Sequence, residues 1–179
     1  MLVLIVLLPL IVSCTKQQPV EKISWNPVID QNDIIILSKP INDFKKHLNA
    51  AQQFDKKGQK AKSADELKLM KTGIGDLEYY YIPLVNAKLH LSAAYRLTNR
   101  NEIATAQEEL NNLYGLIFNA KSYADKRTPP IKSDELNSLI NNFGAFNSDF
   151  TKVAKDSRDK FIQYAEQIQK LITPQASKS

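Results

Sequence analysis

Apolar side chains recur at steps of three and four residues along most of the chain, which is the repeat of one face of an α-helix. The clearest run lies at residues 103–120, where the alternating steps form a seam of the kind that packs in helix bundles. This seam consists of Ile103, Ala106, Leu110, Leu113, Ile117 and Ala120. The pattern predicts an all-α protein in which this segment is a core helix.

Ser, Gly and Pro residues divide the chain before the seam into three further predicted helices. The first runs from Ser38 to Gly58. The second begins at Ser63, whose spacing to Glu66 matches a capping box, and the glycines in residues 72–75 should break it. A third helix follows, and its wide apolar surface predicts that it is the most central one.

Two prolines and a new set of polar residues separate the seam from two more predicted helices. Pro129 and Pro130 cannot continue a helix, and Ser133 can start a fifth, shorter one. A final helix carries apolar residues from Phe150 onwards and is closed by Pro174.

Short loops between consecutive helices favour antiparallel neighbours. The sequence therefore predicts an up-and-down antiparallel helix bundle with about four main helices and shorter additions. Paired helices over residues 40–72 and 83–124 also resemble a helical repeat array, but no clear period indicates a long solenoid.

A different pattern marks the N-terminus, where the apolar run MLVLIVLLPLIVSC ends in small residues and Cys14. The run is shorter than the ~20 residues of a membrane-spanning helix and is typical of an export signal. It resembles the lipobox of bacterial lipoproteins, in which the cysteine becomes the lipidated first residue. No Lys or Arg precedes Cys14, unlike the usual signal. The alternative is that Cys14 is a small hydrophobic residue in a buried segment.

These patterns divide the chain into four parts. We expect a signal peptide over residues 1–13, a lipidated Cys14 with its tether over 14–37, a helical bundle domain over 38–173 and a disordered tail over 174–179. The tether contains the apolar run Ile34-Ile35-Ile36-Leu37, which is too short to classify by periodicity. It is predicted as a short strand or an extended segment docked on the core.

The residue after the cysteine bears on which membrane holds the anchor. In enterobacterial lipoproteins an Asp there commonly marks inner-membrane retention, and this chain has Thr15 instead. The chain in this respect resembles the outer-membrane class. We therefore expect a lipid-anchored protein of the bacterial cell envelope that faces the periplasm, with the membrane as one partner.

Composition narrows the chemistry of the domain. The 179 residues are 43% apolar, enough for one domain with a core, and the single cysteine excludes an internal disulfide or a thiolate metal site. The net charge of +5 is modest, and no nucleic-acid recognition motif is present. A basic stretch around Gly58 includes Lys56 and Lys57; it is either a solvated loop or a contact with anionic lipid headgroups.

The sequence contains no recognisable catalytic motif. His47 and His90 do not form a spaced pair such as H-E-x-x-H, and neither a nucleophile elbow nor a phosphate loop occurs. We expect no enzymatic activity, no cofactor and no metal. His90 borders an apolar stripe, which favours a hydrogen-bonded structural histidine over a pH sensor.

Three consecutive tyrosines form the one unusual local composition. Tyr79, Tyr80 and Tyr81 are a candidate aromatic binding surface, because tyrosines supply rigid amphipathic area at interfaces. The alternative is that they anchor a helix start against the core with their hydroxyls in water.

Residues 61–118 resemble part of the YfdX-like family. The features that carry the resemblance are AKSADELKL, followed by the helix start YIPLV and the later ELNNL segment. The resemblance implies a helical envelope protein linked to stress responses, without an assigned catalytic site.

Two functions fit these observations. The first is a non-enzymatic envelope lipoprotein whose helical bundle binds another protein or itself. The alternative is a bundle that binds a small molecule or lipid in a cavity between its helices. A filled core with an exposed aromatic patch would favour the first, and a deep apolar cavity would favour the second.

Overall fold

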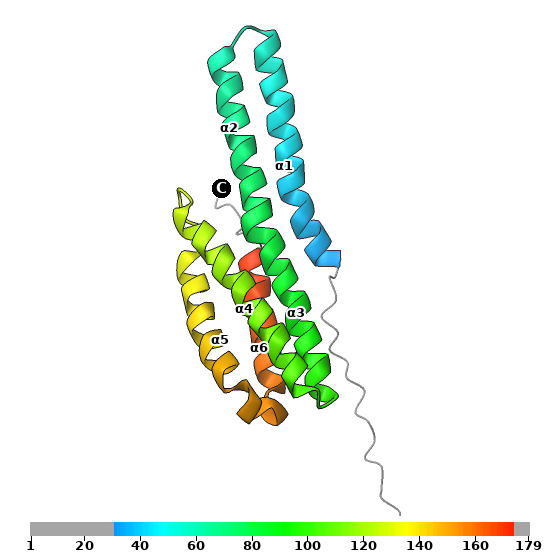
Figure 1. Ribbon diagram of the computed structural model, residues 1–179. Helices are drawn as coiled ribbons and strands as arrows, with labels where there is room; N and C mark the ends of the chain where they lie inside the picture. The colour runs from blue at the N-terminus through cyan, green and yellow to red at the C-terminus, as the bar shows by residue number, and fades with distance from the viewer. Residues whose placement is uncertain (1–30, 174–179) are drawn as a thin grey trace, which may run out of the picture.

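The computed structural model describes residues 31–173, which are helical along most of their length and contain no strand (Figure 1). The elements in chain order are α1 (Gln31–Lys56), α2 (Lys60–Asp76), the π-helical turn η1 (Leu77–Tyr81), α3 (Ile82–Asn99), α4 (Ile103–Lys126), α5 (Ser133–Val153), the 3-10 turn η2 (Ala154–Asp156) and α6 (Arg158–Ile172). The predicted all-α fold is confirmed.

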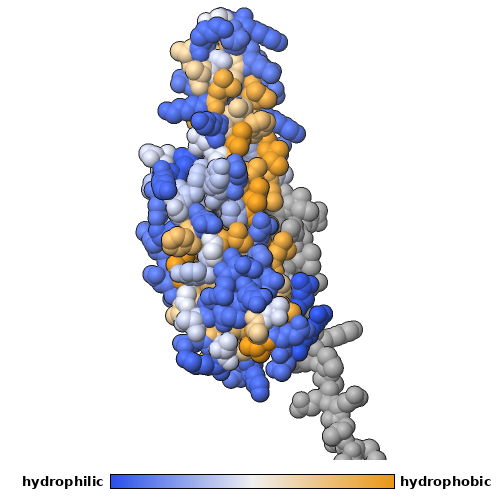
Figure 2. All heavy atoms as spheres, in the orientation of Figure 1, coloured by the Kyte–Doolittle hydropathy of each residue, from blue (hydrophilic) through white to orange (hydrophobic). Residues whose placement is uncertain are grey.

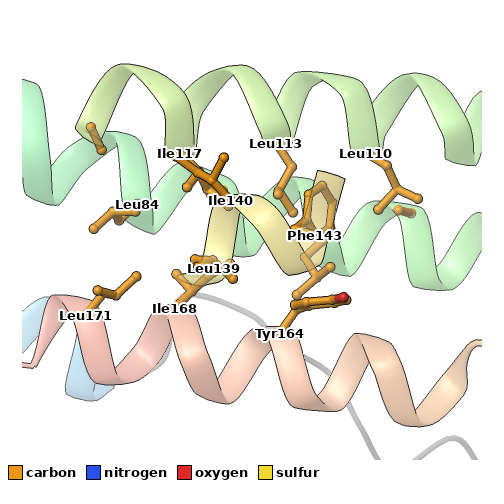
Figure 3. Close-up of a cluster of buried hydrophobic side chains, with 14 of the residues drawn as sticks. Leu84, Leu110, Leu113, Ile117, Leu139, Ile140, Phe143, Tyr164, Ile168 and Leu171 are labelled. Carbon is orange, nitrogen blue, oxygen red and sulfur yellow. The ribbon is translucent and has the colours of Figure 1, made fainter. Parts of the chain in front are cut away.

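Helices α3 to α6 form a four-helix bundle, in which α3 packs on α4 and α6 while α5 packs on the same two helices. The predicted seam of α4 faces its centre, and Leu110, Leu113 and Ile117 are fully buried. Figure 3 shows these side chains above Phe143 of α5 and Ile168 of α6. The helix phase read from the sequence is therefore correct.

Aromatic rings fill the space between α5 and α6. Phe146 of α5 lies with its ring centroid 5.8 Å from Phe161 and 5.3 Å from Tyr164 of α6. Phe143 meets Tyr164 edge-on at 5.1 Å. Such pairs add ~0.5–1.5 kcal/mol each beyond the burial of their surface, so they stabilise the contact between α5 and α6.

Helices α1 and α2 form a hairpin, here called the arm, that extends beyond the bundle (Figure 1). The arm is joined to the bundle without a loop, because α2, η1 and α3 run as one continuous helical segment from Lys60 to Asn99. The described chain thus has a compact bundle and a protruding hairpin.

The first helix begins earlier than predicted, at Gln31 instead of Ser38. The run predicted as a strand or extended segment is therefore helical, and Pro40 lies inside the helix. An internal proline costs ~3 kcal/mol in an isolated helix. Burial of Ile36 in the core, with Leu37 packed against it, offsets that cost and explains why the helix continues through the proline.

Two predicted boundaries of the second helix are wrong. The helix begins at Lys60, and Ser63 is no cap: its buried hydroxyl donates to the Ala51 carbonyl of α1 at 3.0 Å. The glycines at 73 and 75 do not break the helix, since it continues through them into η1. Packing against α1 holds this segment helical despite the low propensity of glycine.

The π-helical turn lies directly before Pro83. A proline in a regular helix clashes with the carbonyl four residues earlier and leaves it without a partner. The wider i→i+5 spacing of η1, seen where the Ile82 N–H donates to the Leu77 carbonyl, changes the backbone path at that point. The continuous helix therefore accommodates Pro83 without ending.

The last two helices also differ from the prediction. The fifth helix is long and includes Phe150, which had been assigned to the final helix. The separation falls at η2 and Ser157, where the buried Ser157 hydroxyl donates to the Ala154 carbonyl at 2.6 Å. No glycine or proline marks this break, so the pattern of apolar residues did not indicate it.

The arm and the α3–α4 hairpin are two copies of one sequence pattern with an offset of 43 positions (90 − 47). At this offset the chain aligns without a gap. The identical pairs include Pro40/Pro83, Lys45/Lys88, His47/His90, Leu48/Leu91, Ala50/Ala93, Ala51/Ala94, Ala61/Ala104, Glu66/Glu109, Leu67/Leu110 and Ile74/Ile117. The apolar pattern of each helix taken singly does not reveal this period.

The turns of the two hairpins repeat at the same offset. Gly58 and Asn101 both have positive φ, at 71° and 61°. The following residues close the same six-residue turn: Gln59 N–H donates to the Phe54 carbonyl, and Glu102 N–H to the Leu97 carbonyl, each at 2.9 Å. This is the Schellman ending of a helix. The internal repeat is therefore structural as well as sequential.

Candidate interaction site

An apolar face runs along the arm and is not covered by any other described element. It is here called the arm face and consists of Ile41, Phe44, Leu48, Leu67, Met70 and Ile74. Ile41 and Leu67 are each 43% exposed and Ile74 is 40% exposed, while the other three are partly buried. Figure 2 shows apolar side chains gathered along the arm.

A groove indents the arm face where the arm approaches the bundle. Its cavity volume is about 260 Å³, and its lining is almost entirely apolar. The lining residues are Pro40, Ile41, Phe44, Gly73, Ile74 and Leu77. Exposed apolar side chains grouped on two adjacent helices are typical of a surface that binds another protein.

The three tyrosines do not form one surface. Tyr79 is 51% exposed and lies with its ring 5.5 Å from that of Tyr123. Tyr80 is fully buried, and its hydroxyl donates to the Leu171 carbonyl at 3.1 Å. Tyr81 is half-buried against the edge of Tyr80. Successive helical residues point in different directions, so of the three rings Tyr79 is the most exposed and Tyr80 is inaccessible.

Burial or a hydrogen bond raises the pKa of each of these phenols. Removal from water raises the pKa of Tyr80 and of Tyr81, since both are withdrawn from solvent. For Tyr79, the hydrogen bond with Glu78 raises the pKa. All three hydroxyls therefore stay protonated at neutral pH and can act only as neutral hydrogen-bonding groups.

Lys56 and Lys57 lie at the tip of the arm, and both are exposed. The tip contains two further lysines. Lys60 pairs with Asp55 at 2.6 Å, and Lys62 lies 5.6 Å from the ring centroid of Phe54. The predicted lysine and tyrosine candidates are thus at opposite ends of the arm and belong to two separate surfaces.

A charged cluster fixes the arm to the bundle. The Asp76 carboxylate at the end of α2 accepts hydrogen bonds from Arg127 Nε at 2.8 Å and from the Tyr123 hydroxyl at 2.9 Å. Burial and this bond raise the pKa of Tyr123 to about 12, and the Asp76 carboxylate raises the pKa of Arg127. These groups join the end of α2 to α4 and so hold the arm against the bundle.

Both histidines form equivalent pairs inside the two hairpins. His47 Nδ1 lies 2.7 Å from Glu66, and His90 Nδ1 lies 2.5 Å from Glu109. Each pair joins the two helices of its hairpin. The prediction that His90 is hydrogen-bonded is confirmed, and His47 has the same arrangement.

The described residues were searched for a metal site and for a membrane-spanning helix. Between residues 31 and 173, no three His, Cys, Asp or Glu side chains lie together in a way that could hold a metal ion. None of the helices in that range is long and apolar enough to cross a membrane. Cys14 lies outside the described residues, and its lipidation remains a prediction.

The arm face was missed by the sequence analysis, because its apolar residues follow the same helical period as buried ones. A signal was nevertheless present: the 43-residue repeat pairs exposed Leu67 with buried Leu110. Aligned with each other, the two copies have similar apolar faces. In the described residues a single further hairpin, formed by α5 and α6, follows them and can cover one face.

Comparison with known proteins gives one match. A model of the YfdX protein family matches residues 6–120, which is more than half of the chain and extends the resemblance seen over 61–118 in both directions. The match includes the arm, α3 and most of α4, and thus both copies of the repeat. No curated protein and no solved structure matches the chain. The chain belongs to the YfdX family.

Proposed function

We propose that this protein is a non-enzymatic lipoprotein of the bacterial cell envelope whose helical domain acts by binding a protein, either another chain or itself. The observation that carries the proposal is the arm face. Its apolar side chains come from two helices that project beyond the bundle, where a partner can reach them.

The packing of the bundle favours this function over the binding of a small molecule. Large side chains such as Phe143, Phe150 and Phe161 are fully buried in its centre. Every buried side-chain nitrogen or oxygen in the described part of the chain has a hydrogen-bond partner. A ligand cavity usually contains convergent polar groups. In the described residues such groups line open hollows at the surface, such as one of about 710 Å³ beside Pro129 and Pro130, and the centre of the bundle is filled by side chains.

We further propose that Cys14 holds the protein on the outer membrane. Two or three acyl chains on this residue would give stable attachment, whereas a single chain is marginal. Cys14→Ala should release the protein from the membrane fraction or leave its signal uncleaved. Mass spectrometry that finds an uncut, unmodified N-terminus in the native host would contradict the anchor.

The binding function is tested by photo-crosslinking in intact cells. A photoreactive amino acid placed at Leu67 should give crosslinked products to protein, and the same group at exposed Asn141 on α5 should not. Tyr79→Ala and the Lys56→Gln/Lys57→Gln pair test the other two surfaces in the same cells. The proposal fails if Leu67 gives no products while the purified protein turns over a substrate in an unbiased hydrolase screen.

A further inference from the structure

The internal repeat shows what normally covers a face of this kind. Three exposed residues of the arm face correspond to fully buried residues of the second hairpin: Ile41 to Leu84, Leu67 to Leu110 and Ile74 to Ile117. Figure 3 shows the second set directed toward α5 and α6. The same face is therefore a core in one copy and a surface in the other.

The cover of the second copy is itself a helical hairpin, because α5 packs on α4 and α6 packs on α3. The described chain contains only one such covering hairpin, and the bundle uses it. The arm is also a helical hairpin with an uncovered apolar face on both helices. A second arm therefore has the shape of the missing cover, and its own apolar face is also exposed.

The size of the side chains supports a second arm over a copy of the α5–α6 hairpin. In the bundle, small residues such as Ala87 leave room for the large rings of α5 and α6. The corresponding position in the arm is Phe44. Because core substitutions are tolerated best when total volume is kept, a face that carries Phe44 suits a cover with few large rings. Another arm brings one ring, its own Phe44, together with Leu, Ile and Met side chains.

We propose that the arm face binds the arm face of a second copy of this chain in antiparallel orientation, forming an intermolecular four-helix bundle. This inference rests on the protein-binding function proposed above and names the partner. The two-fold arrangement buries the same residues on both chains, as expected for a closed dimer.

Charge determines the orientation. The tip of the arm carries Lys56, Lys57, Lys60 and Lys62 against one carboxylate, Asp55. Parallel pairing would bring two such tips together, and like charges at close range oppose binding. Antiparallel pairing separates the two tips. It places each near the other arm's base, where charges are mixed: Asp43 and Glu78 are exposed there together with Lys39 and Lys71.

The first test measures the mass of the full chain, purified in detergent, by light scattering over a range of concentrations. Wild type should be dimeric. Leu67→Glu should raise the dissociation constant at least about tenfold, because it buries a charge in the interface. The matched control is Leu69→Glu: Leu69 is 52% exposed, but its counterpart in the second copy, Asn112, is exposed too, so this variant should remain dimeric.

The second test fixes the orientation in native membranes by cysteine crosslinking, with the wild-type chain as the control for Cys14. Met70→Cys lies near the middle of the arm face and should crosslink to itself. Lys57→Cys at the tip should not, and efficient tip-to-tip crosslinking would overturn the antiparallel arrangement. Asn141→Cys on α5 should give no dimer.

The outcomes separate this inference from the proposed function. A monomeric wild type, or equal loss of dimer in Leu67→Glu and Leu69→Glu, overturns the arm-to-arm dimer. If the chain is monomeric and photo-crosslinking at Leu67 still joins it to a different protein, the binding function stands and only the choice of partner is wrong. Circular dichroism that shows unchanged helix content in both variants excludes unfolding as the cause.

Discussion

The arm and the α3–α4 hairpin have closely related sequences and opposite surroundings. Each has a His–Glu pair between its helices and a left-handed residue in its turn, 43 positions apart. Yet Leu110 is fully buried and Leu67 is 43% exposed. The comparison teaches that an apolar stripe specifies a helix face, whereas the elements that follow in the chain decide whether that face becomes a core.

Truncation of the equivalent leucines gives the largest expected contrast. Leu110→Ala should lower the free energy of unfolding by about 2–5 kcal/mol, because it removes buried surface and leaves a cavity. Leu67→Ala should lower it by less than about 1 kcal/mol, as is usual for exposed positions. Chemical denaturation at a protein concentration low enough to keep the chain monomeric measures both. Equal losses would mean that the arm face is covered within one chain.

The two glycines near the end of the arm should respond differently to alanine. A Cβ on Gly75 would lie 2.7 Å from the Tyr123 hydroxyl, whereas a Cβ on Gly73 meets nothing within 4 Å. Gly73→Ala should stabilise the helix by about 0.4–1 kcal/mol. Gly75→Ala should be less stable than Gly73→Ala by about 1–2 kcal/mol, since it displaces Tyr123 from Asp76.

Thermal melts of these two glycine variants provide the measurement. In the second copy, Phe118 occupies the position equivalent to Gly75. Phe118 is 55% exposed, so that position accommodates a side chain. Similar stabilisation by both alanines would show that the junction tolerates movement of Tyr123.

Alkaline pH should weaken the junction between the two regions. The pKa of Tyr123 is about 12 in the folded chain and about 10 when unfolded. The folded chain thus holds this proton more tightly, and the resulting stabilisation is complete below pH 10 and lost as pH rises from about 10 to 12.

Tyr123→Phe isolates this contribution, because the other tyrosines are present in both proteins. The loss of stability between pH 9 and 12, followed by denaturant titration, should be smaller in the variant than in wild type. An identical pH dependence would show that Tyr123 does not contribute to it.

The smallest effect is expected from the repeated His–Glu pairs. Each Glu lies 19 residues after its His and is only partly buried. Glu66→Gln and Glu109→Gln should each change the free energy of unfolding by less than about 1 kcal/mol, and the two values should agree within about 0.5 kcal/mol. A large difference would show that the hairpins differ in more than their covering.

The parts of the fold that depend on local pattern were predictable. The α4 seam, including Leu110 and Leu113, follows from spacing alone, and the loop at Pro129 and Pro130 follows from proline chemistry. These features need no knowledge of the partner surface, so one segment of sequence is sufficient to recognise them.

The errors lie where contacts between distant residues override local preference. Ser63 resembles a cap, but its hydroxyl bonds to Ala51 across the hairpin. Gly75 resembles a breaker, but it provides space for Tyr123 of another helix. Tyr80 resembles an interface residue, but its hydroxyl donates a hydrogen bond to the Leu171 carbonyl. None of these partners is adjacent in sequence, so local pattern did not reveal them.

The uninterrupted helical segment from Lys60 to Asn99 has a mechanical consequence. A loop between arm and bundle would act as a hinge, whereas a helix resists bending. At about 1.5 Å per residue, this segment acts as a stiff lever. A sideways force on the tip would therefore act on the Asp76–Arg127 contact and would not be absorbed by a flexible loop. A load on the arm would reach the bundle at that point.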